Sequence, residues 1–157
     1  MNIGVSGHQD IPEEAIAFVR QGITNVLSSA TGDLVGVASL AAGADQLFAS
    51  IIFEHGGRLH VIIPSKGYER TFSDPNELSQ FRCLLNKADV VETLSYQEPS
   101  EEAFLAAGRR VVDASNLLLA VWDGKPAQGK GGTADIVEYA RKRGTRVEVI
   151  WPPQTSR

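Results

Sequence analysis

The chain has 157 residues, of which 43% are hydrophobic and 22% charged, and its formal net charge is −4. This length suits one domain with a proper core, and the acidic balance disfavours a nucleic-acid groove, which needs a one-sided basic surface. No apolar stretch has membrane-spanning length, and the residues after Met1 read as a strand, without a signal-peptide pattern. We therefore expect a single soluble, cytoplasmic domain, residues 1–157, with no membrane or nucleic-acid partner.

Strands and helices are expected to alternate along the chain. The expected strands span residues 2–6, 34–39, 59–63, 89–94, 117–122 and 146–151. Asp10 and Glu13 form a capping-box pattern before the first helix, Asp74 and Ser100 are predicted N-caps of two later helices, and Gly144 is a predicted C′ glycine. This alternation predicts an α/β fold, a single Rossmann-like, doubly wound and mostly parallel sheet with helices on both faces.

The single cysteine, Cys83, excludes an intrachain disulfide and a multi-thiolate metal site. Phe81, Leu84 and Leu85 flank it, so Cys83 is predicted to be a small residue of the core. The sequence predicts no metal site and no cofactor.

The most informative stretch lies between residues 117 and 144. Its apolar start is typical of a strand buried on both faces, and a glycine-rich loop and a helix from Thr133 follow. Glycines at the start of a helix leave backbone N–H groups bare at the positive end of the helix dipole, so this junction is predicted to bind phosphate. The alternative is a structural connection in which glycine serves only a positive φ and tight packing.

In a doubly wound sheet, ligands bind at the carboxyl ends of the strands, where the strand order reverses. The turns that follow the strands are therefore expected to meet at one edge, and two of them are small-residue openings of helices. We expect a nucleotide or another phosphorylated small molecule there. The expected ligand-binding residues are Ser6, Gly7, His8, Ser39, Gly43, Ala44, Asp45, Pro64, Tyr68, Trp122, Asp123, Gly131, Gly132 and Thr133.

Several of these residues have two interpretations. His8 is a ligand contact or proton donor, or else a structural turn residue. Asp45 receives a ribose hydroxyl, or else simply favours the positive end of its helix. Trp122 stacks on a base, or else belongs to the core.

The chain resembles the SLOG superfamily of nucleotide-binding proteins, which includes DprA/Smf and the Lonely Guy phosphoribohydrolases. The resemblance rests on GVSGH at residues 4–8, SLAAGAD at residues 39–45, Pro64 at a strand end, and GKGGTADIVEYA at residues 129–140. It implies a Rossmann-like nucleotide-binding domain, and a homodimer is compatible with it.

Lonely Guy enzymes cleave the N-glycosidic bond of a nucleoside monophosphate with a PGGxGTxxE motif and an upstream arginine. The resemblance implies that arginine at Arg109 or Arg110, but Ile136 stands where the motif has its glutamate. The nearest acids are Asp135 and Glu138.

Two functions remain open. One is a sensor or carrier module that binds a nucleotide-derived ligand without chemistry. The other is a phosphoribohydrolase or ribosyltransferase-like enzyme in which Arg109 clamps phosphate and Asp135 or Glu138 supports the oxocarbenium ion or activates water. The absent glutamate favours the binding module. The acidic charge balance disfavours DNA binding by analogy with DprA.

Overall fold

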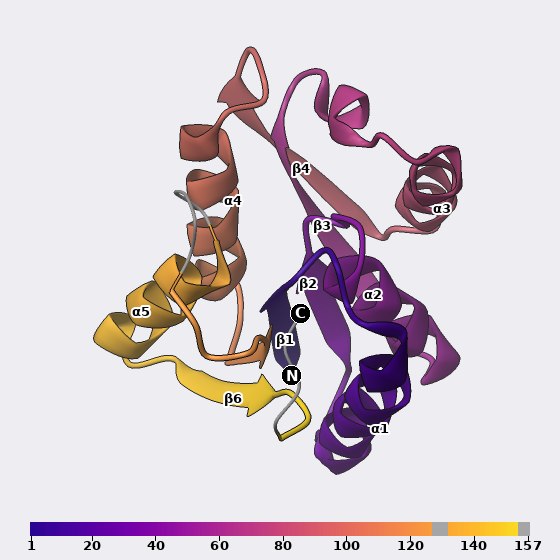
Figure 1. Cartoon of the computed structure of the whole chain (residues 1–157), viewed down its shortest axis with the longest axis vertical. Coiled ribbons are helices and arrows are strands. Elements are labelled where there is room, and N and C mark those ends of the chain that lie inside the picture. Colours follow the sequence, from indigo (N-terminus) through magenta and orange to yellow (C-terminus); the bar gives the residue numbers. More distant parts are fainter. Residues whose placement is uncertain (127–131, 154–157) are drawn as a thin grey trace.

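The structure, a computed structural model, describes residues 1–126 and 132–153 of the chain. Strands and helices alternate as predicted (Figure 1). In chain order the elements are β1 (Asn2–Gly7), α1 (Glu13–Ser29), β2 (Val35–Ala38), α2 (Ala44–Glu54), β3 (Arg58–Ser65), the 3₁₀ helix η1 (Tyr68–Thr71), α3 (Pro75–Asn86), β4 (Val90–Tyr96), α4 (Glu101–Asp113), β5 (Leu117–Val121), α5 (Thr133–Arg143) and β6 (Arg146–Ile150).

The strands form one six-stranded sheet in the order β4-β3-β2-β1-β5-β6. Every neighbouring pair is parallel. From β1 the chain winds outward to β4, then returns to place β5 against the other side of β1 and β6 beyond it. The strand order therefore reverses between β1 and β5, which confirms the doubly wound prediction, and ligands of such folds bind at this point.

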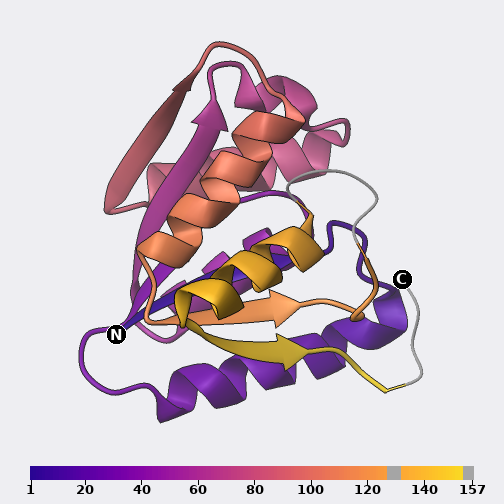
Figure 2. The ribbon, with the colours of Figure 1, turned by 90° about the vertical axis from the view of Figure 1, so that its left-hand side faces the viewer.

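Helices cover both faces of the sheet, as predicted. Helices α1, α2 and α3 bury Val19, Phe48 and Phe81 in one core against one face. Helices α4 and α5 bury Val111 and Ile136 in a second core against the other face. Figure 2 shows α4 and α5 together in front of the sheet, with α1 below it.

Most predicted helix ends are confirmed. Asp74 Oδ1 accepts a hydrogen bond from Asn76 N at 2.8 Å, Ser100 Oγ accepts one from Ala103 N at 3.0 Å, and Gly144 has φ 84° at the end of α5. These contacts satisfy backbone groups that the helix itself leaves unpaired.

The prediction of a capping box at Asp10 and Glu13 is wrong. Helix α1 begins at Glu13, and Pro12 occupies its N-cap position without a side-chain cap. The carbonyl of Pro12 accepts from Ala15 N at 2.8 Å, so the first turn starts later than the sequence pattern indicates.

The predicted burial of Cys83 is also wrong, since Cys83 is exposed on α3. Phe81 and Leu84 are buried and define the inward face of the helix. At about 100° per residue, Cys83 points away from both of them. Among the described residues, no helix is long and apolar enough to cross a membrane.

Candidate functional site

A cavity of about 590 Å³ opens at the carboxyl edge of the sheet, across the ends of β1, β2 and β3. Helices α2, α3, α4 and α5 and the 3₁₀ helix η1 complete its walls. The expected ligand-binding residues found in these walls are Ser6, Gly7, His8, Ser39, Asp45, Pro64, Tyr68, Gly132 and Thr133. Gly43, Ala44, Trp122 and Asp123 lie outside the described walls, and Gly131 falls outside the described residues.

Two glycines let the loop after β1 pack against the start of α2. A Cβ on Gly7 would lie 2.5 Å from Ala44 Cβ. Gly43 has φ 79°, and a Cβ there would lie 2.2 Å from the carbonyl oxygen of Gln9. The amide of Ala44 donates to the carbonyl of His8 at 3.1 Å. Gly43 and Ala44 therefore shape the cavity from behind its walls.

Asp45 holds the turn between β2 and α2. Its Oδ2 accepts hydrogen bonds from Ser39 N at 3.2 Å and from Ala41 N at 3.4 Å. Burial raises the pKa of Asp45 to about 7, and the backbone N–H groups of Ala41, Ser39 and Leu40 oppose that rise. The carboxyl group thus closes its own loop while it also lines the cavity.

The start of α5 meets the end of β1 where the strand order reverses. Ser6 Oγ donates to Thr133 Oγ1 at 3.4 Å, and both residues line the cavity. Gly132 stands at the N-cap, and no side chain caps the helix in the described part of the chain. The positive end of the α5 dipole therefore lies at the cavity wall, together with two hydroxyl groups.

His8 joins the loops that follow β1 and β5. It is buried, its Nε2 accepts a hydrogen bond from Asp123 N at 3.1 Å, and its ring meets the edge of Trp151 with centroids 5.2 Å apart. Trp122 donates from Nε1 to the carbonyl of Lys125 at 2.8 Å. These contacts favour a structural contribution from His8, and they place Trp122 and Asp123 in the neighbouring turn.

Aromatic side chains form part of the cavity wall. Tyr68 packs edge-on against Phe72, Phe81 and Phe104 with centroid distances of 5.5, 5.5 and 6.3 Å. Phe72 and Phe104 also line the cavity. Neither phenylalanine is among the ligand-binding residues expected from the sequence. Their apolar character alone indicates a core, and only the tertiary arrangement separates a core from a cavity wall.

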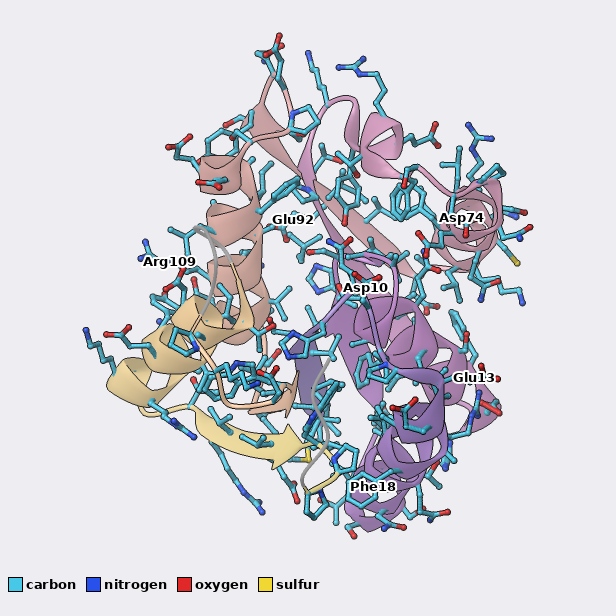
Figure 3. The ribbon with its side chains drawn as sticks, viewed as in Figure 1. Asp10, Glu13, Phe18, Asp74, Glu92 and Arg109 are labelled. Carbon is cyan, nitrogen blue, oxygen red and sulfur yellow. The ribbon has the colours of Figure 1, made fainter. Side chains whose placement is uncertain are left out.

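The residues expected to carry enzyme chemistry do not line the described cavity. Arg109 is exposed, its guanidinium lies 5.3 Å from the centroid of the Tyr139 ring, and Figure 3 shows it on the outer side of the molecule. Ala107 and Val111 point from α4 into the cavity wall, so the intervening Arg109 points elsewhere.

The two candidate acids of α5 are likewise outside the walls. Glu138 is exposed and pairs with Lys142 at 2.8 Å. Asp135 is half-buried but does not line the cavity. The alternative arginine, Arg110, makes a two-point ion pair with Glu92 at 2.7 and 3.1 Å. The structure therefore does not bring the predicted arginine and acids together at the described cavity.

The electrostatics of the cavity come from helix ends more than from charged side chains. None of the described lining residues is lysine or arginine, whereas Asp10, Asp45 and Glu77 contribute carboxyl groups. In the described part of the chain, no group of three or more histidine, cysteine or acidic residues could hold a metal ion. An anion in this cavity would be stabilised chiefly by backbone N–H groups, hydroxyls and helix dipoles.

Comparisons with known proteins extend this description. No protein-family model and no curated protein matches the sequence. Among solved structures, DNA processing protein A (DprA) from Streptococcus pneumoniae matches with a TM-score of 0.66 and 19% identity, over 94% of this chain and 49% of that one. DNA processing protein A from Helicobacter pylori, described for its single-stranded DNA binding mode, matches with a TM-score of 0.66 and 16% identity, over 95% and 64%. The protein TM1055 matches with a TM-score of 0.59 and 13% identity, over 93% and 71%.

These likenesses define the fold. The chain shares the Rossmann-like α/β fold of these proteins, as the alternation of strands and helices predicts. It spans about half of the Streptococcus protein and just under two thirds of the Helicobacter protein.

Proposed function

We propose that this protein binds a nucleotide or a nucleotide-derived phosphorylated ligand in the cavity, as a sensor or carrier module. One observation carries the proposal. The positive end of α5 and the hydroxyls of Ser6 and Thr133 meet in the wall of a cavity of about 590 Å³ where the strand order reverses. This is the position at which doubly wound folds bind ligands, and a helix start there suits a phosphate group.

The size and the lining of the cavity support the same ligand class. A volume of about 590 Å³ falls within the range of small-molecule sites. One side offers the start of α5, and the other offers the faces and edges of Phe72 and Phe104. A phosphate at the first and an aromatic base at the second would use both surfaces. Such a ligand also fits the single cytoplasmic domain that the sequence predicts.

A binding module is better supported than the enzyme. Cleavage of an N-glycosidic bond needs an acid positioned at the reacting carbon and a group that holds the phosphate. Arg109 and Glu138 instead make surface contacts with Tyr139 and Lys142, and Asp135 lies outside the described walls.

Calorimetric titration with nucleoside monophosphates tests the proposal. Gly132→Asp should abolish binding, because it adds a like charge where the phosphate approaches the backbone. Aspartate is a favourable N-cap residue, so this variant should keep its fold. Gln97→Glu is the control, since it adds the same charge at an exposed position outside the described walls. Binding that survives in Gly132→Asp, or is absent in the unmodified protein, would contradict the proposal.

A further inference from the structure

Asp45 and Tyr68 add two polar groups to the cavity wall, on the elements that follow β2 and β3 and not on α5. Both side chains line the cavity, and their residues are only 7% and 6% exposed. Neither takes part in the contact between Ser6 and Thr133, and the proposed phosphate site leaves both unused.

The Tyr68 hydroxyl is able to form hydrogen bonds with a ligand. No hydrogen bond joins it to any residue that the structure describes, although its ring is held by Phe72, Phe81 and Phe104. Burial, and then the nearby Asp45 carboxylate, raises the pKa of Tyr68 above its usual range, so the hydroxyl keeps its proton. The hydroxyl is open to the cavity rather than sealed from it, so a ligand or a water molecule can supply its partner.

The order of the strands fixes where these groups lie relative to the phosphate site. Ser6 lies near the end of β1, Asp45 follows the neighbouring β2, and Tyr68 follows β3, one strand further. Neighbouring strands lie about 4.8 Å apart, so the segments that carry Asp45 and Tyr68 leave the sheet in successive steps from β1 along the edge. In a nucleotide the ribose follows the phosphate, and the base follows the ribose. The sugar would therefore lie beside Asp45 and Tyr68, and the base would lie towards Phe72 and Phe104.

From this arrangement we infer that Asp45 and Tyr68 bind the 2′-hydroxyl of a ribose, so that the cavity selects ribonucleotides over 2′-deoxyribonucleotides. The 2′-hydroxyl donates to the Asp45 carboxyl group and accepts from the Tyr68 hydroxyl, which gives the unpartnered tyrosine its bond. A deoxyribose makes neither of these two hydrogen bonds and leaves the Tyr68 hydroxyl without a partner from the ligand, and a site built to bond a hydroxyl discriminates against a ligand that lacks it. The inference rests on the proposed function, because it needs a nucleotide in this cavity.

The test compares four ribonucleoside monophosphates with their 2′-deoxy counterparts by calorimetry. The ribonucleotide of the preferred pair should bind at least about tenfold more tightly, since its 2′-hydroxyl makes two hydrogen bonds that the deoxyribonucleotide cannot make. Tyr68→Phe should lower the affinity for the ribonucleotide and leave that for the deoxyribonucleotide nearly unchanged. Asp45→Asn should reduce the ratio of the affinity for the ribonucleotide to the affinity for the deoxyribonucleotide. Tyr96→Phe, at a tyrosine of β4 outside the described walls, should change neither affinity.

The outcomes separate this inference from the proposed function. Equal binding of both sugars overturns the ribose assignment and leaves nucleotide binding in place. A preference for ribose that persists in Tyr68→Phe and in Asp45→Asn assigns the selection to other residues, and so overturns the inference as well. If no nucleotide of either kind binds, both the proposed function and the inference fail.

Discussion

Ser6 Oγ and Thr133 Oγ1 lie 3.4 Å apart, although 127 positions separate the two residues in the chain. The contact joins the end of β1 to the first turn of α5 at the point where the strand order reverses. Hydroxyl pairs usually approach to about 2.8 Å, so this bond is a weak one. Both hydroxyls therefore keep most of their hydrogen-bonding capacity for a ligand that lies beside them.

The first prediction concerns Thr133→Val, which removes one of these hydroxyls and nearly preserves the side-chain volume. The affinity for a nucleoside monophosphate should fall roughly two- to tenfold, the usual net value of one hydrogen bond. Thr145→Val, which lies after α5 and outside the described walls, should have no effect on binding. Calorimetry measures the affinity of both variants and of the unmodified protein. If Thr133→Val binds as tightly as the unmodified protein, Thr133 does not contact the ligand.

A second prediction separates two glycines that both have a positive φ. Gly43 and Gly56 have φ 79° and 71°, but only a Cβ at Gly43 meets other atoms, at 2.2 Å from the Gln9 carbonyl. Gly56→Ala should cost about 1–2 kcal/mol of unfolding free energy from the backbone strain alone. Gly43→Ala should cost about 3 kcal/mol or more, because a clash adds to that strain. Denaturant titration compares the two, and equal losses would mean that the loop after β1 does not pack against Gly43.

The third prediction is a pH dependence set by Asp45. Its pKa rises on folding from 3.8 to about 7, so the folded state holds a proton that the unfolded state has lost between these values. Protonation of Asp45 therefore adds to the free energy of unfolding at low pH. This contribution is complete below about pH 4 and is lost as the pH rises to about 7, and the total loss is at most about 4 kcal/mol. In Asp45→Asn this slope should disappear.

Denaturant titrations at pH 5 and pH 8 check the sign of this effect. The unmodified protein should lose more stability between these two values than Asp45→Asn does. Equal losses would mean that the backbone N–H groups of Ser39 and Ala41 outweigh burial and keep the carboxyl group ionised at both pH values.

The fourth prediction concerns Arg109, the candidate phosphate-binding arginine if the protein were an enzyme. The guanidinium stacks on the Tyr139 ring outside the described walls, so Arg109→Ala should leave nucleotide affinity unchanged within about twofold. Loss of the cation–π contact should cost at most about 1 kcal/mol of stability at this exposed position. A tenfold loss of affinity, measured by calorimetry, would show that Arg109 reaches the ligand.

The fifth prediction is weak binding of DNA. The Helicobacter relative is described for binding single-stranded DNA, but this chain has a formal net charge of −4, and the described cavity lining has no lysine or arginine. Because counterion release needs a basic footprint, fluorescence anisotropy at low salt should show no nanomolar affinity for single or double strands. Nanomolar binding would contradict this expectation.

The sequence predicts the fold well because the fold depends on local patterns. The alternation of apolar strands and capped helices indicates a doubly wound sheet, and Asp74, Ser100 and Gly144 mark helix ends that the structure confirms. Given such a sheet, the turns after parallel strands must meet at one edge. Ser6 and Thr133 could therefore be placed together without any knowledge of their side-chain contacts.

Side-chain direction could not be predicted in the same way. Arg109 is close in sequence to Ala107 and Val111, but only those two line the cavity, because the rotation of α4 is set by its packing on the sheet. Gly43 carries the same turn signal whether it faces a ligand or the carbonyl of Gln9. Cys83, among apolar neighbours, is exposed for a similar reason. The direction in which each of these residues faces depends on contacts between segments that are distant in the sequence.

Nuclear magnetic resonance of the backbone amides during titration with a nucleoside monophosphate tests the central claim most directly. The shifts of Ser6, Gly132 and Thr133 should change most, because the phosphate is expected at the start of α5. Smaller changes should follow at Ser39 and Tyr68. If the perturbed amides instead cluster around α1 and β6, at the cavity lined by Phe18 and Val149, or if none respond, the protein does not bind nucleotides at the site described.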